Sequence, residues 1–183
     1  MSKQVIDLSF GLSICGVDEL PVRIKRFKPT HLISVSDPVD EPLRFPSAVE
    51  VLRLAFWDIQ SFSGLVRHMV SSEERHHYPS ADHAESILAF GRNIPASAKL
   101  LIHCWAGVSR STAAAMLVIC QRHPGHEQSA FRLVKALRPQ ADPNRLLVKH
   151  GDRLLKARGR MLAALDADYP PKSNRHQQVF DLG

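Results

Sequence analysis

The sequence is 183 residues long, with 44% hydrophobic and 23% charged residues, which fits one globular domain and excludes a disordered chain. The longest apolar run has only eight residues, so no membrane-spanning segment is predicted. Three cysteines, Cys15, Cys104 and Cys120, are too few for a disulfide framework and indicate a reducing, cytoplasmic location. The net charge of +6 belongs to residues 121–183, which carry 12 Lys and Arg against 6 Asp and Glu. This basic third is a candidate surface for an anionic partner.

The predicted elements alternate between strands and helices along the chain. Short apolar runs predict strands at 8–15, 31–35, 50–56 and 99–103. Residues 60–79 are polar with apolar islands, and we expect a loop or lid there. Helices are predicted at 16–27, 80–93 (with Ser80 as N-cap), 111–122, 126–138 and 144–166. This order predicts an α/β domain over residues 1–168, with a central, mostly parallel sheet flanked by helices, and a C-terminal tail at 169–183.

The most informative segment follows the predicted strand 99–103 and reads HCWAGVSRS over residues 103–111. A buried strand ends at a cysteine, five residues follow, and an arginine enters a helix. Such a turn directs successive backbone N–H groups to one point, and the helix N-terminus adds its own N–H groups and partial positive charge. Gly107 lets the backbone curl closely, and the planar guanidinium of Arg110 fits two phosphate oxygens. The pattern predicts a phosphate cradle with Cys104 at its base, held as a thiolate by the same groups.

HCWAGVSRS resembles the HCx5R(S/T) signature of the cysteine-dependent protein phosphatases, in the form typical of the dual-specificity branch and its small bacterial relatives. The resemblance covers residues 5–166 in the order of elements, and it implies a protein-tyrosine-phosphatase-like fold with the phosphate loop between a strand and a helix. It implies that Cys104 is the nucleophile and that Arg110 binds the phosphoryl oxygens. Ser111 would assist breakdown of a phosphocysteine intermediate, and His103 would order the loop. The phosphate-binding residues would be Trp105, Ala106, Gly107, Val108, Ser109 and Arg110.

Such chemistry also requires a general acid, because an alkoxide or phenoxide is a poor leaving group at neutral pH. The family supplies an aspartate on a loop after an upstream strand, and Asp58 has that placement. The 46 residues from Asp58 to Cys104 exceed the gap expected of compact members, and the extra length lies in 60–79. Asp142 is the alternative acid, since low-molecular-weight phosphatases use a downstream Asp-Pro pair; its ordinary role would be to cap a helix. We favour Asp58.

The sequence therefore predicts a phosphomonoester hydrolase of the protein tyrosine or dual-specificity type that acts through a phosphocysteine, without metal or cofactor. Its partner would be a phosphorylated protein or another phosphomonoester, with inorganic phosphate or vanadate as ligands of the site. Two alternatives stay open: a phosphate-binding module without turnover, and a phosphatase for a phosphoinositide or an RNA 5′-triphosphate. A rhodanese or an arsenate reductase also holds a cysteine in an anion cradle, but neither requires Asp58 or the hydroxyl after the arginine.

Overall fold

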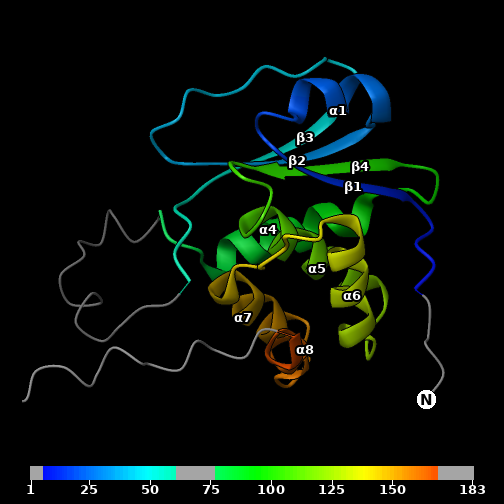
Figure 1. Cartoon of the computed structure of the whole chain (residues 1–183), viewed down its shortest axis with the longest axis vertical. Helices are drawn as coiled ribbons and strands as arrows, with labels where there is room; N and C mark the ends of the chain where they lie inside the picture. Colours follow the sequence, from blue (N-terminus) through cyan, green and yellow to red (C-terminus); the bar gives the residue numbers. More distant parts are fainter. Residues whose placement is uncertain (1–5, 61–76, 169–183) are drawn as a thin grey trace, which may run out of the picture.

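The computed structural model describes residues 6–60 and 77–168, which form a parallel four-stranded sheet with helices on both faces (Figure 1). The strands, in spatial order, are β1 (Gly11–Gly16), β4 (Lys99–Cys104), β2 (His31–Ser36) and β3 (Glu50–Ala55). Helix α1 (Leu20–Phe27) covers one face of the sheet. The other face is covered by α4 (Ala81–Asn93), α5 (Arg110–Arg122), α6 (Glu127–Leu137), α7 (Arg145–Leu154) and α8 (Arg160–Asp168). The α/β class and the parallel sheet predicted from the sequence are confirmed.

Strand β4 lies in the middle of the sheet and determines where a site can form. It pairs with β1 on one side and β2 on the other, and Cys104 is in register with Gly16. Because the strands are all parallel, the carboxyl ends of all four lie at the same edge, where α/β proteins build their binding sites. The segments that begin at Val17, Asp37, Phe56 and Trp105 therefore leave the sheet close to one another.

Helix α5 is the central support of the larger core. Every residue from Arg110 to Cys120 is buried, which explains why its sequence is apolar on all sides and not amphipathic. The helix packs on β4 and contacts α4, α6 and α7. On the opposite face of the sheet, Leu101 forms a smaller core with Cys15, Leu20 and Leu32 beneath α1. The strand that delivers Cys104 and the helix that receives Arg110 are thus both fixed by burial on their apolar sides.

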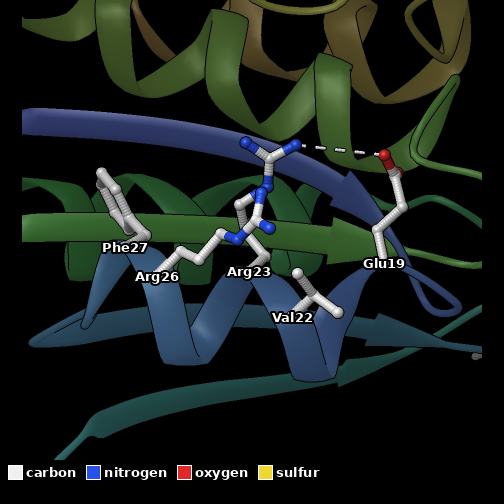
Figure 2. Close-up of a pocket in the computed structure, with 5 residues that line it drawn as sticks. All are labelled: Glu19, Val22, Arg23, Arg26 and Phe27. Carbon is white, nitrogen blue, oxygen red and sulfur yellow. Dashed lines mark ion pairs between the residues drawn. The ribbon is translucent and has the colours of Figure 1, made fainter.

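The outer side of α1 carries a cavity. Its volume is about 500 Å³ (Figure 2). Its lining residues are Glu19, Val22, Arg23, Arg26 and Phe27. Glu19 and Arg23 lie one turn apart and form a long ion pair of 3.9 Å across its rim. An exposed pair at that distance adds little to stability.

The single helix predicted at 144–166 is wrong, because the structure divides it into α7 and α8. Lys156, Arg158 and Gly159 have φ values of 53°, 56° and 85°, so the backbone turns in the left-handed region between the two helices. Gly159 takes this conformation at no steric cost, and it is the signal of a break within an otherwise helical pattern. The Asp152 carboxylate stabilises the turn by accepting hydrogen bonds from the Gly159 and Met161 N–H groups at 2.7 and 3.0 Å.

Other differences from the sequence predictions are small. The first strand was predicted at 8–15 and is observed at 11–16, because pairing with β4 begins only at Gly11. Most of the lid expected at 60–79, and the tail expected at 169–183, lie outside the described residues. Among the helices that the structure describes, none has the length and hydropathy to cross a bilayer.

We predict that Gly151→Ala destabilises the fold at the contact between α7 and α5. A Cβ at this position would lie 2.6 Å from Leu117 Cγ and 2.7 Å from its Cδ1. The free energy of unfolding should fall by about 1–2 kcal/mol, because overpacking outweighs the gain in helix propensity. Urea unfolding measures this difference. In a Leu117→Ala background the same substitution should be neutral or stabilising, and equal destabilisation in both backgrounds would contradict the prediction.

Candidate active site

The loop that joins β4 to α5 has all its carbonyl groups directed to partners outside the loop. Trp105 O accepts from Val17 N at 2.9 Å, and Ala106 O and Gly107 O accept from the Arg138 guanidinium at 3.0 and 3.1 Å. Val108 O accepts from Asp142 N at 2.9 Å. Ser109 O accepts from Asn144 N at 3.1 Å and from Ala113 N in α5 at 3.0 Å. The partners therefore come from β1, from the end of α6, from the segment before α7 and from α5.

This arrangement orients the N–H groups of the loop as well. The C=O of one residue and the N–H of the next point in opposite directions across a trans peptide, and residues 6–60 and 77–168 include no cis peptide bond. Five outward carbonyls at residues 105–109 therefore turn the five N–H groups of residues 106–110 to the inner side of the loop. None of the N–H groups of residues 105–109 donates to an acceptor in the described part of the chain. These donors are available to an anion.

Gly107 allows the loop to approach β1 closely. Its φ is +69°, and a Cβ at this position would lie 2.5 Å from both Cys15 C and Gly16 N. Gly16 faces the loop in turn, since its own Cβ would lie 3.0 Å from Trp105 O. Two glycines thus let two backbones meet without side chains between them, as the sequence predicted for Gly107 alone.

Arg138 holds the outer side of the loop, a role that no local sequence pattern indicates. Its guanidinium binds the Ala106 and Gly107 carbonyls and also pairs with the Glu19 carboxylate at 2.7 Å. Glu19 is fixed by a hydrogen bond of 2.8 Å from Gly16 N. The hydrogen bond from Arg138, followed by that from Gly16, lowers the pKa of Glu19 below its ordinary value, so the pair is charged at neutral pH. The result is a charge-assisted clasp from the end of α6 to the start of α1.

Cys104 lies at the base of the loop with two neighbours that the sequence singled out. Its Sγ forms a hydrogen bond of 3.2 Å with Ser111 Oγ, and both groups are buried. His103 Nε2 is 2.9 Å from Ser34 Oγ on β2, and burial lowers the pKa of this imidazole to about 4. A neutral His103 therefore bridges two central strands, β4 and β2. Burial raises the pKa of Cys15 and Cys120 to about 12, which keeps those two thiols protonated and unreactive.

One guanidinium nitrogen of Arg110, Nη1, makes the hydrogen bonds that hold this side chain in the described part of the chain. The other nitrogens are therefore available to a ligand in the loop. Its Nη1 donates to Ser36 O at 3.1 Å, to Phe56 O at 2.7 Å and to Asp37 Oδ1 at 2.5 Å. The guanidinium is thus tied to the ends of β2 and β3, although the residue begins α5. Its Nε is buried and has no hydrogen-bond partner in the described part of the chain. A buried N–H without an acceptor is costly, and a bound anion would satisfy it.

Asp58 lies against the same loop. Its Oδ1 accepts from Ser109 Oγ at 2.6 Å and from Asn144 Nδ2 at 2.8 Å, while Oδ2 is 4.0 Å from Arg110 Nε. The fold therefore brings Asp58 to Arg110 across 52 residues of sequence. Since Oδ1 already accepts two hydrogen bonds, Oδ2 is the oxygen that would carry a proton.

Asp142, the alternative acid, is exposed and contacts the loop through its backbone N–H. The structure does not use it as a helix cap. Asn144 is the N-cap of α7, and its Oδ1 accepts from Leu147 N at 2.9 Å. Its Nδ2 binds Asp58 and also Ile59 O at 3.1 Å, so one side chain both starts a helix and positions the candidate acid.

Sequence reasoning missed Asp37, Arg138 and Asn144. The sequence contains a signal from which Asp37 could have been identified, because this residue follows a predicted strand at the edge of the sheet where Cys104 also lies. Asn144 had a weaker one, as a polar residue directly before a helix. Arg138 had none, since it lies 31 residues from Gly107 in sequence and meets it only in the folded chain. Within residues 6–60 and 77–168, no group of three or more His, Cys, Asp or Glu side chains is placed to hold a metal ion.

Several solved structures share this arrangement of elements. The chain matches DUSP15 with a TM-score of 0.58 at 18% identity, over 92% of this chain and 98% of that one. It matches the Yvh1 phosphatase domain from Chaetomium thermophilum with a TM-score of 0.55 at 20% identity, over 85% and 95% of the two chains. For PTPMT1 in complex with PI(5)P the TM-score is 0.55 at 16% identity, over 85% and 97%. No protein-family model and no curated protein matches the sequence. The chain therefore has the fold of the protein tyrosine and dual-specificity phosphatases, as the resemblance implied.

We predict that Arg138→Met weakens binding of inorganic phosphate or vanadate by about 10- to 100-fold, because two charge-assisted hydrogen bonds that orient the loop are lost. Methionine retains most of the apolar stem, so the fold should survive. Isothermal titration measures the affinity. Arg132→Met, at an exposed position of the same helix, is the matched control and should bind like the wild type. If Arg138→Met binds the anion as tightly as this control, the clasp does not orient the loop.

Proposed function

We propose that this protein is a phosphomonoester hydrolase that acts through a phosphocysteine on Cys104. The observation that carries the proposal is the loop of residues 105–109, whose carbonyls are all paired on the outside. Because the carbonyls are paired on the outside, the N–H groups of the loop face its inner side, as do Arg110 Nε and Cys104 Sγ. A tetrahedral phosphate dianion would accept hydrogen bonds from the N–H groups and from Nε, with its phosphorus next to Sγ. The shared fold with known phosphatases supports the same conclusion.

In the first step, the Cys104 thiolate attacks phosphorus in line with the leaving oxygen. The S–P bond forms as the P–O bond to the alcohol or phenol breaks. The loop N–H groups and Arg110 hold the non-bridging oxygens, so that negative charge in the transition state meets fixed donors. Asp58 gives the proton on Oδ2 to the leaving oxygen, which departs as a neutral hydroxyl compound.

In the second step, the Asp58 carboxylate accepts a proton from a water molecule, and the water oxygen attacks phosphorus. The new P–O bond forms as the S–P bond breaks, and inorganic phosphate and the thiolate are released. The Ser111 hydroxyl, 3.2 Å from the sulfur, donates to the departing thiolate and lowers the barrier to its release. Asp58 then carries a proton again and the cycle closes.

A phosphorylated protein, with tyrosine alone or with serine and threonine as well, is the substrate class that we favour. The loop side chains at 105, 106, 108 and 109 include no lysine or arginine that would bind a second phosphate group. The fold by itself does not select this class, since the structure of PTPMT1 contains PI(5)P. A binding module without turnover is disfavoured by the presence of the complete set of nucleophile, arginine, hydroxyl and acid.

Cys104→Ser should abolish turnover of an aryl phosphate, because the nucleophile is lost while the loop N–H groups and Arg110 remain. The same variant should still bind a phosphorylated peptide, and vanadate should block the wild type. Release of inorganic phosphate and calorimetric binding measure the two properties. Cys120→Ser removes another buried cysteine, in α5, and serves as the control that keeps its activity. More than a few per cent of wild-type turnover in Cys104→Ser would rule out the phosphocysteine route.

Asp58→Asn should lower kcat by about 10²–10⁴-fold on phenyl phosphate, whose leaving group needs a proton, and far less on an aryl phosphate with a weakly basic leaving group. Asparagine keeps the acceptor for Ser109 and Asn144, so the loop should stay in place. The alkaline limb of the pH–rate profile should also disappear. Asp142→Asn is the control and should retain that limb. If the limb persists in Asp58→Asn and is lost in Asp142→Asn, the acid is misassigned.

A further inference from the structure

A pocket of about 210 Å³ opens directly beside the phosphate loop. It shares Cys104 and Trp105 with the loop but none of residues 106–110, so it is a neighbour of the phosphate cradle and not part of it. Its other walls come from the turn after β1 and from the end of β2 with the segment that follows. A substrate whose phosphoryl group is at Cys104 would place an adjacent part of itself over this pocket.

The walls of the pocket combine apolar side chains with negative charge. Val17, Val35 and Leu43 contribute aliphatic surface, and the Trp105 side chain at the mouth is 64% exposed. Asp40 and Glu41 contribute exposed carboxylates. Within the described residues, neither carboxylate has a basic side chain within ion-pair distance. An aliphatic stem that ends in a cation matches such a lining, because the stem buries against the apolar walls while its head meets the acids and the indole.

The position of this negative charge is fixed relative to the phosphate cradle. The Asp37 carboxylate binds Arg110 Nη1 at 2.5 Å, and Asp37 is also the first residue of a tight turn. In that turn, Asp40 N donates to Asp37 O at 3.1 Å and Asp37 N donates to Asp40 Oδ2 at 2.9 Å. Two hydrogen bonds thus tie Asp40 to the residue that holds the cradle arginine. Asp40 therefore has a defined position relative to the phosphoryl site, and Glu41 is the next residue in the chain.

We propose that this pocket binds the side chain of an arginine or lysine next to the phosphorylated residue of a protein substrate. The inference rests on the proposed phosphatase function and specifies its substrate. The phosphoryl group occupies the cradle, the basic stem lies along Val17, Val35 and Leu43, and its charge meets Asp40 and Glu41. The same two carboxylates repel a second phosphate group beside the first, which disfavours phosphoinositides and RNA 5′-triphosphates as substrates.

The test compares phosphotyrosyl peptides that carry arginine, or its uncharged isostere citrulline, at one flanking position at a time. At the position that reaches the pocket, the wild type should have a kcat/KM about three- to tenfold higher for arginine, as expected for two exposed ion pairs. Asp40→Asn with Glu41→Gln should bring this ratio close to one. The ratio does not depend on how much folded enzyme each preparation contains, and asparagine keeps the acceptor for Asp37 N.

Glu50→Gln with Glu85→Gln is the matched control, because it removes two exposed carboxylates that do not line the pocket. This variant should keep the wild-type ratio. Equal rates on arginine and citrulline peptides at every position, a preference for citrulline, or an unchanged ratio in Asp40→Asn with Glu41→Gln would overturn the proposal. Turnover of an aryl phosphate, which has no flanking residue, tests the phosphatase function separately. The dissociation constants of Cys104→Ser for the arginine and citrulline peptides give the corresponding ratio of affinities, measured without turnover.

Discussion

The outward pairing of the five carbonyls of residues 105–109 is the constraint on which the rest of the site depends. Because each peptide is trans, a carbonyl that is held on the outside fixes an N–H group on the inside. The donors that hold these carbonyls come from three separate parts of the chain: Val17, Ala113, and the segment that contains Arg138, Asp142 and Asn144. The loop therefore has its shape only when β1, α5 and the ends of α6 and α7 are assembled.

Arg110 provides the second link between the fold and the chemistry. Its Nη1 gathers the carbonyl ends of β2 and β3 together with Asp37, so the guanidinium plane is fixed by the edge of the sheet. A cation that is buried at 3% exposure must be paired or it destabilises the fold. Here the same contacts that satisfy it also direct its remaining N–H groups to the cradle. The arginine is thus oriented before any phosphate binds, which reduces the entropic cost of binding.

The parts of the site that the sequence predicted are those encoded by neighbouring residues. The cradle from His103 to Ser111 is continuous, so strand, turn and helix signals coincide there, and Asp58 follows a strand of the same sheet. The clasp by Arg138 was not predictable, because it depends on where the folded chain places the end of α6 beside the loop and Glu19, and on no local pattern. The break between α7 and α8 was missed for another reason. The apolar spacing continues through it, and only the positive φ at Gly159 and its neighbours stops the helix.

The most direct test of the account is an amide chemical-shift titration of the whole chain with inorganic phosphate. If the carbonyl pairing turns the N–H groups inward, the amide signals of residues 106–110 and the Arg110 Nε–H signal should shift together, with a single dissociation constant. The amides of α1, which lines a cavity with two arginines of its own, should not move. Phosphate-dependent shifts at α1 with none in the loop would contradict the account, because the anion would then bind somewhere other than the cradle.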